Sequence, residues 1–99
     1  CMFTSTLLSA GTKVKVAQVG PPPDDLKPVK DIRINPRTRK QLIEGFWKGQ
    51  HGVSGHVAYV GSESDRERLR KDGKLMVVIS DLAAQKVTVI APAAYFVHA

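Results

Sequence analysis

The chain has 99 residues, of which 42% are hydrophobic and 24% charged, and its formal net charge is +6. This length predicts one domain, residues 1–99, with a core large enough to fold alone but no room for an inserted second domain. No apolar run is long enough to cross a bilayer, and the start lacks the pattern of a secretory leader, so no membrane partner is expected and the cytoplasm is the default location.

Most of the predicted elements are strands. Residues 12–19 alternate between valine and lysine, as expected of a half-buried strand. Residues 20–25 contain three consecutive prolines and predict a rigid turn. Partial alternation over residues 28–34 then predicts a second strand.

A first helix is predicted after Asn35. Asn35-Pro36 is a good helix cap followed by a proline at the first helical position. Apolar residues then recur at helical spacing as far as Trp47. Gly45 and Gly49 indicate that this helix is short.

A second helix is predicted in the charged segment that follows. Ser64 and Glu67 have the spacing of a capping box, and Gly73 is placed to end the helix after about two turns. Strands are predicted before and after it, and the apolar run 75–79 indicates a strand buried on both faces. The pattern therefore predicts a mainly β domain with antiparallel strands; the further strands are expected at residues 56–60, 86–90 and 95–97.

Two basic clusters accompany these elements. Seven basic residues lie between Lys27 and Lys48, and five lie between Arg66 and Lys74. The second cluster is interleaved with acidic residues and indicates a solvated helix face. The first cluster is more one-sided and could suit an acidic partner, although nucleic acid is not the partner that the sequence as a whole favours.

The single cysteine is residue 1. One cysteine excludes an internal disulfide and a multi-cysteine metal site, and no cofactor or metal is expected. Further candidate residues for chemistry are Ser54 and His56 in the stretch Val53-Ser-Gly-His-Val57. Asp81 follows a predicted buried strand, and His98 and Ala99 end the sequence.

In their order, these motifs resemble those of inteins, the protein-splicing members of the Hint superfamily. Inteins begin with Cys or Ser, often carry a Thr near the position of Thr6, and contain a mid-domain histidine block. They also carry a late Asp-Leu block, matched here by Asp81-Leu82, and close on His-Asn. The resemblance implies a compact Hint-like horseshoe with one or two short helices, without an endonuclease, that acts as a monomer on flanking extein segments in cis.

The resemblance also implies a role for each matched residue. Cys1 would attack the preceding carbonyl and move the acyl group from nitrogen to sulfur. His56 would protonate the departing amine, and Ser54 could orient the carbonyl. Asp81 would influence the first thiol step, and His98 would assist the final cyclisation.

The chain departs from the intein pattern at several positions. Ala99 stands where inteins have Asn, and alanine has no side-chain amide to cyclise, so C-terminal cleavage is expected to be blocked. The mid-domain block is irregular because Ser54 stands two positions before His56, where inteins have Thr three positions before. Thr88 stands where many inteins carry a late histidine.

Two other functions remain open. The run Gly55-His-Val-Ala-Tyr-Val60 is similar to the histidine motif of Cys-His amidases that cut peptidoglycan, although those domains place the cysteine at the start of a buried helix. The third alternative is a non-enzymatic nucleic-acid-binding module that uses the basic cluster between residues 27 and 48.

Overall fold

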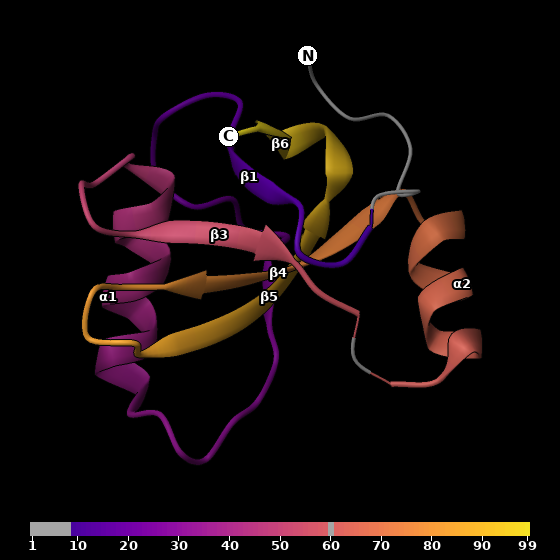
Figure 1. Ribbon diagram of the computed structural model, residues 1–99, viewed down its shortest axis with the longest axis horizontal. Coiled ribbons are helices and arrows are strands. Elements are labelled where there is room, and N and C mark those ends of the chain that lie inside the picture. The colour runs from indigo at the N-terminus through magenta and orange to yellow at the C-terminus, as the bar shows by residue number, and fades with distance from the viewer. Residues whose placement is uncertain (1–8, 60) are drawn as a thin grey trace.

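The computed structural model describes residues 9–59 and 61–99. These residues form a six-stranded sheet in the order β2-β5-β4-β3-β1-β6, in which every pair of neighbours is antiparallel (Figure 1). The predicted class, mainly β with antiparallel strands and short helices, is confirmed. The elements in chain order are β1 (Lys13–Val16), β2 (Lys27–Pro28), α1 (Pro36–Trp47), β3 (Ser54–Val57), α2 (Glu63–Lys71), β4 (Lys74–Ser80), β5 (Lys86–Pro92), a 3-10 turn (Ala93–Tyr95) and β6 (Phe96–His98).

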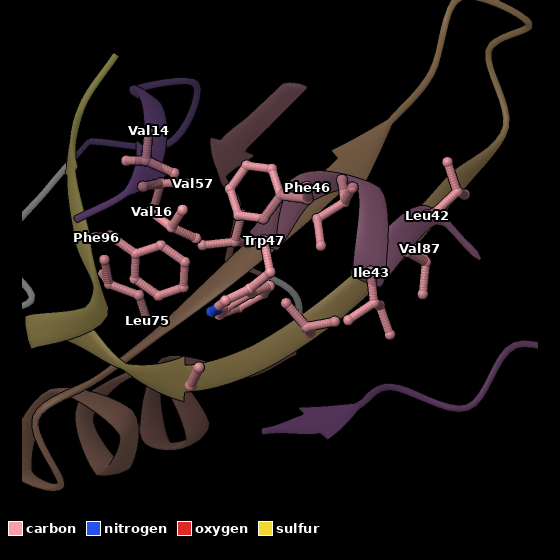
Figure 2. Packing of buried hydrophobic residues seen from close by; sticks show 14 of the residues in the cluster. Val14, Val16, Leu42, Ile43, Phe46, Trp47, Val57, Leu75, Val87 and Phe96 are labelled. Atoms are coloured by element: carbon pink, nitrogen blue, oxygen red, sulfur yellow. The ribbon is translucent and has the colours of Figure 1, made fainter. Parts of the chain in front are cut away.

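The core lies between α1 and one face of the sheet. Alternate residues of each long strand point to this face, as in β5, where every second residue from Val87 to Ala91 is buried. The helix contributes one apolar stripe. Figure 2 shows strand residues such as Val14, Val16 and Val87 packed against the helix. The buried residues of this core are Val14, Val16, Leu42, Ile43, Phe46, Trp47, Val57, Leu75, Val77, Ile79, Val87, Val89, Ala91, Ala93 and Phe96.

Three aromatic rings form the centre of this core. The ring centroids of Phe46 and Trp47 on α1 are 5.4 Å apart, and Phe96 of β6 lies 6.4 Å from the first and 5.8 Å from the second. The two pairs that include Trp47 are edge-to-face, which is a favoured arrangement of aromatic rings. The helix is thereby tied to the last strand of the chain.

Helix α1 begins where the sequence predicts. The side chain of Asn35 accepts a hydrogen bond of 2.7 Å from the backbone N–H of Arg37, and Pro36 occupies the first turn. The helix runs for 12 residues and passes through Gly45 without a break. It ends before Gly49, whose φ of +69° is readily adopted by glycine.

Helix α2 corrects one detail of the sequence prediction. Its capping box consists of Ser62 and Asp65, not Ser64 and Glu67. The Ser62 hydroxyl accepts from the N–H of Asp65, while the Asp65 carboxylate accepts from the N–H of Ser62. The helix therefore starts earlier and spans nine residues. Both serines have an acidic residue three positions on, so the local pattern did not distinguish them.

The strand predicted over residues 28–34 is wrong for most of its length. Only Lys27 and Pro28 pair with β5, and the N–H of Val29 adds one hydrogen bond to Thr88 O at 2.8 Å. The chain then leaves the sheet, and Ile32 is 92% exposed. Partial alternation over so short a stretch could not show which residues have a strand to pair with.

The two helices lie on opposite sides of the molecule (Figure 1). Helix α1 packs on the core face, whereas α2 contacts β4. Leu69 of α2 lines a groove together with Met76 and Ile90, which point away from the core in the register of β4 and β5. In the described part of the chain, neither helix is long and apolar enough to cross a bilayer.

Candidate functional site

The predicted nucleophile, Cys1, lies outside the described residues, as does Thr6. The structure therefore bears only on the other predicted site residues. Within residues 9–59 and 61–99, no three His, Cys, Asp or Glu side chains gather as they would around a metal ion.

Ser54 and His56 both lie on β3. Ser54 is exposed and lies opposite Ser80, while His56 is half-buried between Lys13 of β1 and Val78 of β4. Their neighbours Gly55 and Val57 are buried, and Gly55 lies against Phe46 of α1. Side chains alternate along a strand, so Ser54 and His56 point to the face away from the core.

His98 lies on the other face of the sheet. It is the partner of Val14 in the pairing of β6 with β1, and Val14 points into the core. His56 is the partner of Lys13, the residue before Val14. Because consecutive residues of a strand point to opposite faces, the structure does not bring His56 and His98 together on one face. Ala99 lies next to β1, and its N–H donates to Lys13 O at 3.1 Å.

Asp81 holds the turn between β4 and β5. Its Oδ1 accepts hydrogen bonds from the backbone N–H groups of Ala83, at 3.0 Å, and Gln85, at 2.9 Å. The turn needs this support because Ala84 has a φ of +62°, a left-handed conformation that alanine rarely adopts. The bonds describe an Asx turn, so the carboxylate has a structural role at this position.

The face of the sheet away from the core carries a set of lysines that lie far apart in the sequence. We call this surface the lysine face and define it by the register of the six strands. Each of its lysines lies opposite a residue of the neighbouring strand whose side chain also points away from the core. The lysines are Lys13, Lys15, Lys27, Lys74 and Lys86, and His56 lies among them.

The lysine face has no compensating acids in its strands. None of the six described strands contains Asp or Glu. Four of the five lysines are exposed, and Lys74 is half-buried. Like charges on one surface raise the local potential and attract an anionic partner. Clusters of basic residues along the chain do not reveal this set, because Lys13, Lys15 and Lys86 lie outside both clusters.

Helix α2 borders the lysine face with further cations. The guanidinium of Arg66 lies 4.6 Å from the ring centroid of Tyr59, in cation–π contact. Arg70 donates to the carboxylate of Glu67, and this bond lowers the pKa of Glu67. Arg68 faces a groove between the helix and the sheet.

This groove has a volume of about 820 Å³ and lies between α2, the sheet and the loop of residues 29–33. Its sheet side is formed by Met76, Thr88 and Ile90. Its remaining walls combine apolar and charged side chains; they are Val29, Lys30, Asp31, Ile32, Arg33, Asp65, Arg68 and Leu69.

The charges in the groove walls are partly paired. Arg33 donates through its Nε and Nη2 to the two carboxylate oxygens of Asp31, each at 3.0 Å, and these bonds lower the pKa of Asp31. Asp65 is engaged by the capping box of α2. With three cations and two carboxylates, the groove has a formal charge of +1 and extends the positive potential of the lysine face.

Comparison with known proteins gives no relative: no family model, no curated protein and no solved structure matches this chain.

Proposed function

We propose that this protein binds nucleic acid through the lysine face. The observation that supports the proposal is the register of the sheet, which gathers Lys13, Lys15, Lys27, Lys74 and Lys86 on one surface whose strands contain no acidic residue. Lysine side chains spread over a sheet face can each contact a phosphate of a polyanionic chain. This is the binding module left open by the sequence, but of the cluster at residues 27–48 the lysine face includes only Lys27, and its other lysines come from β1, β4 and β5.

Binding through phosphates has a characteristic salt dependence, because each neutralised phosphate releases counterions. If four of the five lysines contact a single strand, the slope of log Kobs against log salt is about −2.8, at roughly −0.7 per phosphate. Affinity then falls about 50-fold between roughly 50 and 200 mM salt.

The experiment is a titration of the protein into a fluorescein-labelled oligonucleotide, followed by anisotropy at several KCl concentrations. The double variant Lys13→Gln, Lys15→Gln removes two charges from the lysine face and is expected to reduce the slope by about 1.4. The matched control Lys40→Gln, Lys48→Gln removes two charges from α1 and its C-cap, on the other side of the sheet.

The control variant should keep the slope of the wild-type protein. A binding constant that is insensitive to salt, or no binding at low salt, would contradict the proposal. Equal losses in the two variants would assign binding to net charge or to the α1 side instead of the lysine face.

Self-processing of the intein type is our second proposal. The observation that favours it is the pairing of β1 with β6, since Ala99 bonds to Lys13 and Lys13 lies opposite His56. At a strand spacing of nearly 5 Å, His56 and Ala99 are about 10 Å apart in one row of the sheet. In this proposal Cys1 is the nucleophile, His56 protonates the departing amine at the amino-terminal junction, and His98 assists the final cyclisation.

A fusion that carries a foreign segment before Cys1 tests this second proposal. Added thiol should release the segment, and Cys1→Ala and His56→Ala should each prevent the release. An intact fusion under folding conditions would remove the proposal. The variant Ala99→Asn, with a cysteine added after residue 99, tests cleavage at the carboxy-terminal junction separately.

A further inference from the structure

The groove between α2 and the lysine face differs from its surroundings in having an apolar interior. Met76 is 7% exposed and lies opposite Ile90 in the pairing of β4 with β5, and Leu69 adds the only apolar side chain that α2 turns toward the sheet. Phosphates gain nothing from contact with such side chains, which instead favour an apolar or aromatic group.

The loop of residues 29–33 extends this apolar surface into solvent. Ile32 is 92% exposed and Val29 is 37% exposed, and both line the groove. An exposed isoleucine by itself is common, but here it lines a groove whose sheet side includes Met76 and Ile90.

The loop is held in this position before any ligand arrives. The N–H of Val29 is bonded to Thr88 O of β5 at 2.8 Å, and Asp31 bonds both the backbone N–H and the guanidinium of Arg33. A loop fixed at both places loses little conformational freedom when it contacts a ligand.

Cations surround the apolar interior. Lys30, Arg33 and Arg68 line the groove. Arg33 is paired with Asp31, and Asp65 is bonded to Ser62, so Lys30 and Arg68 are the groove cations assigned to phosphate contact. Lys27 lies opposite Ile90, so the groove opens directly onto the lysine face.

We infer that this groove receives an unpaired base of single-stranded nucleic acid while its cations and the lysine face contact the neighbouring phosphates. The inference rests on the proposed function and specifies its substrate. A duplex keeps its bases stacked and paired and offers this surface only its backbone, whereas a single strand can turn a base into an apolar groove. The volume of about 820 Å³ is within the range of pockets that enclose small molecules, so a base with its sugar has room.

The experiment measures the contribution of the bases to binding affinity separately from that of the phosphates. Three fluorescein-labelled ligands of equal length are titrated at one salt concentration: an oligothymidylate, the same backbone with abasic sites in place of the bases, and a duplex. The wild-type protein should bind the oligothymidylate about five- to tenfold more tightly than the abasic strand, the gain expected from burying roughly 40–55 Å² of a base against the aliphatic side chains of the groove.

The variant Ile32→Ser tests the groove itself. Because Ile32 is 92% exposed, the substitution is expected to leave the fold intact. It should reduce the preference for bases over abasic sites to less than about twofold and leave binding of the abasic strand and the salt slope unchanged. The matched control is Leu82→Ser, an equally apolar residue that is 87% exposed in the turn between β4 and β5, and it should behave as wild type.

The outcomes distinguish the two proposals. If none of the three ligands binds, the proposed function fails and this inference fails with it. If the abasic strand and the duplex bind as tightly as the oligothymidylate, the base-binding groove is overturned while phosphate binding by the lysine face stands. If Ile32→Ser instead weakens binding to phosphatidylserine vesicles and leaves oligonucleotide binding unchanged, the groove faces a membrane surface and the inference is overturned.

Discussion

The backbone of Gly55 on β3 lies directly against the ring of Phe46 on α1. An ideal Cβ built at Gly55 would be 2.7 Å from Cε1 and 2.9 Å from Cζ of that ring, distances that real Cβ atoms essentially never show. Glycine at this position therefore sets how closely the helix can approach the sheet.

Gly55→Ala is expected to destabilise the protein by about 1–3 kcal/mol, the usual cost of overpacking a core. The free energy of unfolding from urea titration measures the effect. The matched control is Gly20→Ala, because an ideal Cβ at Gly20 has no neighbour within 4 Å and its φ is not in the left-handed region. Equal stability of the Gly55→Ala variant and wild type would show that Phe46 can move aside at no cost.

Asp81→Ala should loosen the turn between β4 and β5. The change removes the acceptor of two backbone N–H groups, and we expect it to lower the free energy of unfolding by about 1–2 kcal/mol. Asp81→Asn keeps a carbonyl oxygen and should retain most of the stability. If Asp81→Ala abolished thiol-dependent release from the fusion while stability stayed unchanged, the carboxylate would act in chemistry and the turn role would be secondary.

The capping box of α2 links the stability of the protein to the ionisation of Asp65 at low pH. Hydrogen bonds from Ser62 lower the pKa of Asp65 below its ordinary value of 3.8. A lowered folded pKa means that this contribution to stability is present above pH 3.8 and is lost as the pH falls through the folded pKa. Ser62→Ala should move the Asp65 pKa up toward 3.8, which carbon-detected NMR of the carboxyl group would measure. An unchanged pKa would contradict the capping geometry.

The hydrogen bond between Tyr95 and Asp25 is expected to make the stability of the protein fall at high pH. The Tyr95 hydroxyl donates to Asp25 Oδ1 at 3.0 Å, and this bond raises the Tyr95 pKa above 10.0. The stability it provides is present below pH 10 and is lost as the pH rises through the folded pKa. Asp25→Asn should lower the Tyr95 pKa, as followed by phenolate absorbance in a Tyr59→Phe background that leaves one tyrosine. The same pKa in both proteins would exclude the bond in solution.

The histidines provide an internal test of the proposed interface. His56 points to the lysine face, whereas His98 shares the face of Val14 and His51 is exposed in the loop after α1. An added oligonucleotide should therefore shift the imidazole resonances of His56 in NMR spectra and leave those of His51 and His98 nearly unchanged. Larger shifts at His98 than at His56 would place the ligand on the wrong face of the sheet.

The class of fold and most of its elements can be predicted from local sequence patterns. The alternation of valine and lysine in β1 and the apolar run of β4 predict strands because side chains must alternate between a buried and an exposed face. The cap at Asn35 predicts the start of α1 because it satisfies local backbone groups. Local patterns of this kind are readable without knowledge of the partner strands.

Which of these residues share a surface depends on strand order and register, which local patterns do not contain. Strand order and register put Lys13 of β1 and Lys86 of β5 on one face, although they lie far apart in the chain. The same register puts His56 and His98 on opposite faces, although both match motifs of the intein family. A shift of one residue in pairing would exchange the faces of a strand, and this register is specified by burial against α1 and not by any short motif.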